Sequence, residues 1–174
     1  MHATTLITGG CRSGKSNHAL KLATDMRRQP QTFVATCTPQ DEEMRQRVQR
    51  HQQERGAEWN TLEVPVKLAE ALTRHGKKAG VMLVDCLTLW ISNMMMEDAD
   101  DQTVQQMCKE VCNVLIAPPC PIILVSNEVG TGIVPENPLA RRYRDLAGWT
   151  NQQIAAACQS VIWMVAGIPV TIKS

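Results

Sequence analysis

The chain has 174 residues, and its 18 basic and 17 acidic side chains give a formal net charge of +1. This length fits a single domain over residues 1–174 with a sizeable buried core. A chain so close to neutrality has no basic field that would attract nucleic acid. Four Trp, one Tyr and one Phe are also too few for a base-stacking platform. Composition therefore argues against a nucleic-acid partner.

The seven cysteines are odd in number and scattered along the chain, unlike a disulfide framework. Cys108 and Cys112 would share one helix face, and without a second pair at zinc-finger spacing we expect both to be buried apolar side chains. No apolar run approaches the length of a membrane span, and no signal-peptide pattern is visible. We therefore expect a reduced, cytoplasmic protein without a membrane span.

Apolar runs alternate with segments of helical periodicity along the chain. The apolar runs are continuous, as in parallel strands that are buried on both faces. In chain order, the predicted strands are Thr4–Thr8, Thr32–Thr36, Val81–Asp85, Ile122–Ser126, Val161–Val165 and Val170–Lys173. The predicted helices are Lys15–Met26, Asp41–Arg55, Val66–His75, Leu87–Met96, Thr103–Leu115 and Pro138–Gln159. This order predicts an α/β fold with a mainly parallel sheet flanked by helices.

For two further short segments we predict a structure but no role in the chemistry. Gly167, Ile168 and Pro169 are expected to turn the last two strands into a C-terminal antiparallel hairpin. The acidic run EDADD, residues 97–101, is expected to be a solvated loop without a chemical role.

Residues 9–16 read GGCRSGKS and match the phosphate-binding pattern G-x-x-x-x-G-K-[ST] between the first predicted strand and helix. Gly9 and Gly14 would let the backbone turn its N–H groups toward an anion. Lys15 is expected to reach the outer phosphates, and the Ser16 hydroxyl to bind Mg²⁺. A chance glycine-rich turn is the alternative. Strand, loop and helix in this order favour a P-loop NTPase-like domain that binds a nucleoside triphosphate.

Acidic residues follow two predicted strands at the carboxyl edge of the sheet, where such folds bind ligands. Asp85 is expected to hold Mg²⁺ directly or through water, and capping the next helix is a second, compatible role. Asn127 and Glu128 begin a long loop that Gly130 and Gly132 would let close over a substrate. An ordinary connection with a capping Asn is the alternative for this loop.

The predicted helix Asp41–Arg55 carries a histidine between two arginines. Helical spacing places His51 and Arg55 on a half-apolar stripe with Arg47 beside it. A histidine on such a face is often structural. The flanking guanidinium charges, however, disfavour the imidazolium form and would keep the ring neutral. A neutral imidazole there could attack phosphorus while the arginines take up the phosphate charge.

Five segments together resemble one enzyme family: GGCRSGKS, DEEM-x-x-R-x-x-x-H-x-x-x-R with the following Glu58-Trp59, VDCLTLWISN, SNEVGTGIVPENPLARRYRDLAG and the closing VAGIPVTIK. The family is the bifunctional adenosylcobinamide kinase/adenosylcobinamide-phosphate guanylyltransferase of cobalamin biosynthesis. The resemblance runs in order from about residue 4 to residue 173. NEVG-x-GIVPE and DCLTLW-x-SN are far more specific than the phosphate loop.

The resemblance implies two reactions with Mg²⁺ and with ATP and GTP as co-substrates. Adenosylcobinamide would first be phosphorylated by ATP or GTP. GMP would then pass from GTP to the new phosphate through a GMP–histidine intermediate at His51, giving adenosylcobinamide-GDP. A homotrimer is also implied. The implied nucleotide contacts are Gly9, Gly10, Cys11, Arg12, Ser13, Gly14, Lys15, Ser16, Val34, Ala35, Thr36, Gln52, Gln53, Glu54, Arg55, Glu63 and Asp85.

This sequence departs from the family pattern in details: Cys11 replaces Ala, Gly56 replaces Pro, and Trp149 is unusually bulky. None of these changes removes a group that the chemistry needs. Two other functions stay open. A P-loop kinase without the guanylyltransferase activity would leave His51 structural. A regulatory GTP-binding switch would need an N-K-x-D guanine-recognition element, which Ser126–Val129 (SNEV) does not supply.

Overall fold

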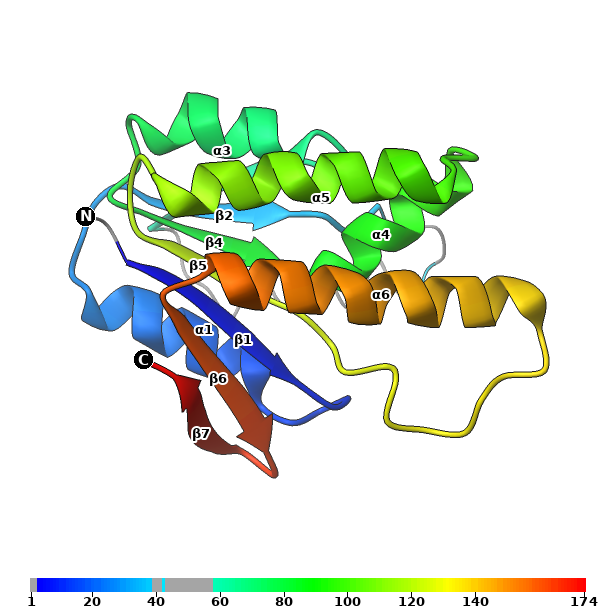
Figure 1. Ribbon diagram of the computed structural model, residues 1–174. Helices are drawn as coiled ribbons and strands as arrows, with labels where there is room; N and C mark the ends of the chain where they lie inside the picture. Colours follow the sequence, from blue (N-terminus) through cyan, green and yellow to red (C-terminus); the bar gives the residue numbers. More distant parts are fainter. Residues whose placement is uncertain (1–2, 39–41, 43–57) are drawn as a thin grey trace.

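The computed structural model describes residues 3–38, 42 and 58–174. Its centre is a seven-stranded sheet in the order β3-β2-β4-β5-β1-β6-β7 (Figure 1). The strands are β1 (Thr4–Gly9), β2 (Gln31–Ala35), β3 (Trp59–Glu63), β4 (Val81–Asp85), β5 (Ile122–Val125), β6 (Ser160–Val165) and β7 (Ile168–Lys173). Every pairing is parallel except the final β6–β7 hairpin, so the expected α/β sheet is confirmed.

Helices cover both faces of this sheet. They are α1 (Lys15–Asp25), α3 (Leu68–Gly76), α4 (Leu87–Met96), α5 (Asp101–Ile116) and α6 (Pro138–Ala157). Figure 1 shows α1 apart from the layer that α3, α5 and α6 form. The core divides accordingly, with a small cluster that includes Ala19 and Ala23 of α1 and a larger cluster against the other helices. No helix in the described part of the chain has the length and apolar character needed to cross a membrane.

Strand β3 was not predicted, and its sequence explains the omission. Asn60, Thr61 and Glu63 are exposed, so the strand lacks the continuous apolar run of its buried neighbours. It pairs in parallel with β2 and forms the edge of the sheet. Edge strands need only one buried partner and tolerate polar side chains. The consequence is that Glu63 ends a strand rather than lying in a loop.

The C-terminal hairpin is confirmed, but its expected turn at residues 167–169 is wrong, because Ile168 and Pro169 already belong to β7. The turn consists of Ala166 and Gly167, both at positive φ (50° and 84°), between the paired residues Val165 and Ile168. Two left-handed residues match the right-handed twist of the flanking strands. Pro169 lies inside β7, where an edge strand tolerates a residue without an N–H.

The acidic run does more than form a solvated loop. The Asp100 side chain caps α5 by accepting from the Thr103 main-chain N–H at 2.8 Å. Asp101 is the first residue of that helix, and its carboxylate pairs with Arg142 of α6 at 2.7 Å. An Asp at these positions satisfies free N–H groups and complements the helix dipole. The run therefore starts α5 two residues earlier than predicted and ties it to α6.

Lys173 joins the last strand to the C-terminal end of α6. Its Nζ donates to the carbonyl oxygens of Ala155, Ala156 and Cys158 at 3.0, 2.9 and 2.5 Å. These carbonyls lie in the last turn of the helix and just beyond it, where main-chain acceptors lack helical partners and the helix dipole is negative. One ammonium group thus anchors the hairpin to the helix layer.

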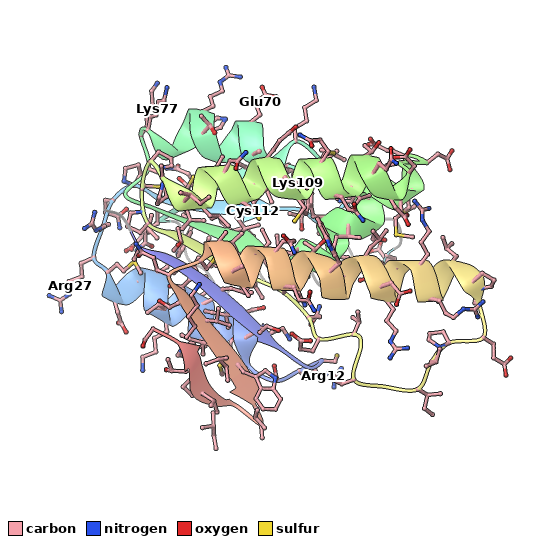
Figure 2. The ribbon with its side chains drawn as sticks, viewed as in Figure 1. Arg12, Arg27, Glu70, Lys77, Lys109 and Cys112 are labelled. Carbon is pink, nitrogen blue, oxygen red and sulfur yellow. The ribbon has the colours of Figure 1, made fainter. Side chains whose placement is uncertain are left out.

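We predict that Lys173→Met lowers the free energy of unfolding by about 1–2 kcal/mol, because three acceptors and the dipole lose their cation. Urea denaturation followed by circular dichroism measures the change. Lys109→Met is the matched control, since Lys109 is an exposed lysine on α5 (Figure 2). Equal stability of the two variants would contradict the capping role.

Candidate functional site

The segment between β1 and α1 has the backbone geometry of a phosphate-binding loop. Gly9 and Gly14 have φ of 151° and 92°, in the region that favours glycine. A Cβ on Gly9 would lie 2.5 Å from the Met164 carbonyl oxygen, and one on Gly14 would lie 3.4 Å from Gly167 Cα. Arg12 lies on the outer part of this loop (Figure 2), and its φ is also positive, at 54°. The first and last glycines of the motif are therefore structural necessities.

Lys15 lies within this loop rather than extending into solvent. Only 7% of the residue is exposed, and Nζ donates to the Gly10 carbonyl at 2.6 Å and to Ser13 Oγ at 3.4 Å. The hairpin turn holds the loop from outside, since the Gly167 N–H donates to the Ser13 carbonyl at 3.1 Å. The ammonium is thus fixed where the loop would surround an anion.

Helix α1 begins directly behind the loop and leaves its N-terminal end available to a ligand. Its N-cap is Gly14, which has no side chain to cap the helix, and α1 has no acidic residue in its first turn. The helix N-terminus therefore keeps its partial positive charge, which favours a phosphate. Ser16 lies half-buried in the first turn.

The predicted residues on β2, β3 and β4 form one row at the carboxyl edge of the sheet. Ala35 pairs with Glu63 on one side and with Asp85 on the other. Asp85 pairs with Val125, which in turn pairs with Ile7 of β1. The parallel register thus aligns three predicted nucleotide contacts, Ala35, Glu63 and Asp85, with the strand that enters the phosphate loop.

Two other predicted contacts, one on β2 and one directly after it, serve mainly to hold the structure. Val34 is fully buried in the core, so its side chain faces away from any ligand. The Thr36 hydroxyl is also buried and bridges to the end of β4, donating to the carbonyl oxygens of Asp85 and Cys86 at 2.9 Å and accepting from the Cys86 N–H at 2.9 Å. Asn93 of α4 donates to the Thr36 carbonyl at 2.7 Å.

Asp85 does not cap α4, so the alternative role expected from the sequence is wrong. The N-cap position belongs to Cys86, and its side chain makes no capping hydrogen bond. The Asp85 carboxylate instead contributes to the surroundings of the Cys86 thiol. Burial, followed by the Asp85 charge, raises the pKa of Cys86, so this thiol is uncharged at neutral pH.

The two motifs that are most specific to the family contact each other. Asn127 Nδ2 lies 3.1 Å from Thr88 Oγ1 and 3.6 Å from Cys86 Sγ, while these two side-chain atoms are 2.9 Å apart. Tyr143 of α6 donates to the Thr88 carbonyl at 3.3 Å, and burial raises the pKa of its hydroxyl. Asn127 is therefore positioned by the segment that follows Asp85.

Glu128 lies against the first residue of the phosphate loop. Its main-chain N–H donates to the Gly9 carbonyl at 3.0 Å, and its Oε1 accepts from the Thr8 hydroxyl. Asn151 of α6 approaches the same oxygen at 3.5 Å, and accepts from Ser126 Oγ at 2.6 Å. Sequence reasoning missed Thr8, Ser126 and Asn151. The one signal for Asn151 was a polar residue of low helix propensity in the middle of a helix.

The loop that follows Glu128 is fastened by arginines from the start of α6. Arg144 donates to the Gly130 carbonyl at 2.7 Å, and Arg141 donates to the carbonyls of Pro135 and Glu136 at 3.0 and 2.5 Å. The capping Asn of this connection is Asn137, whose Oδ1 accepts from the N–H groups of residues 139 and 140. Its middle is open to solvent, and Ile133 is 96% exposed.

Several predicted positions lie outside the described residues. They are His51, Gln52, Gln53, Glu54 and Arg55, together with all of the predicted helix Asp41–Arg55 except residue 42. Across residues 3–38, 42 and 58–174, no three His, Cys, Asp or Glu side chains form a cluster that could hold a metal ion. Ser16 and Asp85 offer a hydroxyl and a carboxylate, the oxygen donors that Mg²⁺ takes when phosphates and water complete its shell.

Comparison with solved structures supports the fold. The flagellar accessory protein FlaH from Methanocaldococcus jannaschii superposes with a TM-score of 0.52 at 16% identity, covering 98% of this chain and 78% of that one. This likeness concerns the architecture alone.

Comparison of sequences supports the family. A bifunctional adenosylcobalamin biosynthesis protein, CobP, from Pseudomonas aeruginosa is 43% identical over 168 residues, covering 97% of this chain and 96% of the relative. Proteins of the same description, named CobU, from Salmonella typhimurium and Escherichia coli are each 39% identical, covering 97% of this chain and 98% of each relative. The family model described as cobinamide kinase / cobinamide phosphate guanyltransferase matches residues 5–172. This chain therefore belongs to the cobinamide kinase / cobinamide phosphate guanyltransferase family of enzymes.

Proposed function

We propose that this chain phosphorylates adenosylcobinamide with ATP or GTP, and then transfers GMP from GTP to adenosylcobinamide phosphate. The product, adenosylcobinamide-GDP, belongs to the late steps of cobalamin biosynthesis. The observation that carries the proposal is the buried Lys15 ammonium at the centre of a formed phosphate loop, in a chain that matches the family over residues 5–172. We assign both reactions to one domain over residues 1–174, in the cytoplasm and within a homotrimer.

For phosphoryl transfer, the loop and α1 supply most of the required positioning. The N–H groups of the loop and the N-terminus of α1 would bind the phosphates, while Lys15 would neutralise charge on the outer ones. Ser16 and Asp85 would hold Mg²⁺, directly or through water. The metal would offset charge that develops between the β- and γ-phosphates. Little covalent chemistry is left to the protein in such a transfer.

For guanylyl transfer, we assign the nucleophile to His51. Its imidazole would attack the α-phosphorus of GTP, and pyrophosphate would leave. A phosphate oxygen of adenosylcobinamide phosphate would then attack the His51–GMP adduct and release the imidazole. Two displacements of moderate difficulty replace a single hard one. Residues 52–55 and Glu63, which ends β3 beside Ala35, are the proposed nucleotide contacts on this side of the site.

We predict that His51→Ala abolishes guanylyl transfer, because no covalent adduct can form. The measurement is the incubation of enzyme with labelled GTP and Mg²⁺, followed by denaturation and a test for an acid-labile, alkali-stable protein adduct. His75→Ala is the control, since His75 lies in the last turn of α3. Guanylyl transfer at the parental rate by His51→Ala would refute the assignment. Phosphorylation without any adduct in the parent would favour the kinase-only alternative.

We predict that Lys15→Met lowers kcat/KM for the kinase reaction by about 100-fold or more, because a preorganised cation is lost from the site where phosphate charge develops. Steady-state kinetics with ATP and adenosylcobinamide measure the effect. Lys21→Met provides a matched control, since Lys21 is an exposed lysine of the same helix. Parental kinetics for Lys15→Met would show that the loop does not bind the reacting nucleotide.

A further inference from the structure

Glu128 is held beside the phosphate loop by groups from the end of β1 and from helix α6. Its N–H bonds the Gly9 carbonyl at 3.0 Å, and its carboxylate accepts from the Thr8 hydroxyl at the end of β1. Asn151 of α6 supports both the side chain and the backbone, because its Nδ2 lies 3.5 Å from Glu128 Oε1 and 3.1 Å from the Asn127 carbonyl. This carboxylate is therefore fixed in one orientation.

The two oxygens of this carboxylate are used differently. Thr8 and Asn151 both approach Oε1, and within the described residues Oε2 has no hydrogen-bond partner. No Lys or Arg of that part of the chain forms an ion pair with Glu128. The residue is half-buried. One oxygen thus orients the group while the other keeps its lone pairs for a proton, an arrangement suited to a general base.

The carboxylate also lies at the correct end of the loop for phosphoryl transfer. Lys15 Nζ, which is expected to contact the outer phosphates, donates to the Gly10 carbonyl at 2.6 Å. Glu128 bonds the adjacent carbonyl, that of Gly9. Because neighbouring carbonyls of the loop accept from the Lys15 ammonium and from the Glu128 main chain, and the Glu128 carboxylate accepts from Thr8 just before Gly9, Glu128 lies next to the region that the terminal phosphate would occupy.

We propose that Glu128 is the general base of the kinase reaction, an inference that rests on the proposed function. The acceptor hydroxyl loses its proton to Glu128 Oε2 as its oxygen forms a bond to the γ-phosphorus. The bond from the γ-phosphorus to the β,γ-bridging oxygen breaks, and the nucleoside diphosphate leaves with that electron pair. Glu128 later returns the proton to solvent.

The second reaction makes no such demand on Glu128. Its acceptor is a phosphate monoester, whose second pKa near 6 leaves the attacking oxygen largely unprotonated at pH 7. The leaving group, pyrophosphate, departs from the α-phosphorus rather than the γ-phosphorus. A general base at Glu128 therefore separates the two activities, whereas a purely structural link between β1, β5 and α6 would support both of them equally.

The test is Glu128→Gln, which preserves side-chain shape and an oxygen that can accept from Thr8. We expect kcat for phosphorylation of adenosylcobinamide to fall by about 100-fold or more, in the range typical of a lost general base. KM for ATP, the rate of guanylyl transfer to adenosylcobinamide phosphate, and the thermal unfolding midpoint are expected to stay near parental values. Glu97→Gln is the control, since Glu97 is exposed just after α4.

Parental kinase turnover by Glu128→Gln would overturn the inference. A parallel loss of both activities, with or without a lowered unfolding midpoint, would overturn it too, since it would point to a structural or general binding role. A kinase defect alone would support it. Failure of the proposed function is a separate result, because it would appear as a parent enzyme that does not phosphorylate adenosylcobinamide at all.

Discussion

The contact on which the site depends is the close approach of Gly9 to the Met164 carbonyl of β6. A side chain at position 9 would place its Cβ 2.5 Å from that oxygen, so only glycine lets β1 run beside β6 and then turn at φ 151°. This turn directs two successive carbonyls, those of Gly9 and Gly10, toward the Glu128 N–H and the Lys15 ammonium. The same backbone turn therefore anchors both the Lys15 ammonium and the main chain of Glu128.

Sheet topology brings the remaining groups to this turn. Strand β5 lies between β4 and β1, so the segment after β5 lies between Asp85 and the phosphate loop. Asn127 contacts the side chains that follow Asp85, and Glu128 contacts the end of β1. Parallel strands place all their carboxyl ends at one edge, which explains how motifs far apart in sequence can form one site. The family's two specific motifs are adjacent because their strands are.

Sequence reasoning succeeded where local pattern and burial agree. The continuous apolar run Val81–Asp85 was predicted as a strand and the segment Leu87–Met96 as a helix, and β4 and α4 have these bounds. Sequence reasoning failed for β3, because this polar edge strand is identifiable only from its pairing with β2. The contacts of Thr8 and Asn151 with Glu128 were also missed, because they join residues 120 and 23 positions apart. Such pairs depend on strand order and helix placement, which no local pattern specifies.

The arrangement suggests how one nucleotide site can support attack at two phosphorus atoms. The described residues concentrate a cation and an oriented carboxylate at the Gly9–Gly10 end of the loop, where the terminal phosphate would lie. Attack at the α-phosphorus needs a nucleophile elsewhere, and the resemblance assigns that role to His51, on a segment separate from the loop. The two reactions would then share the phosphate cradle but use different reacting groups. In this division, the loop and Asp85 are common to both reactions. Substitution of Glu128 would impair the kinase reaction, and substitution of His51 would impair guanylyl transfer.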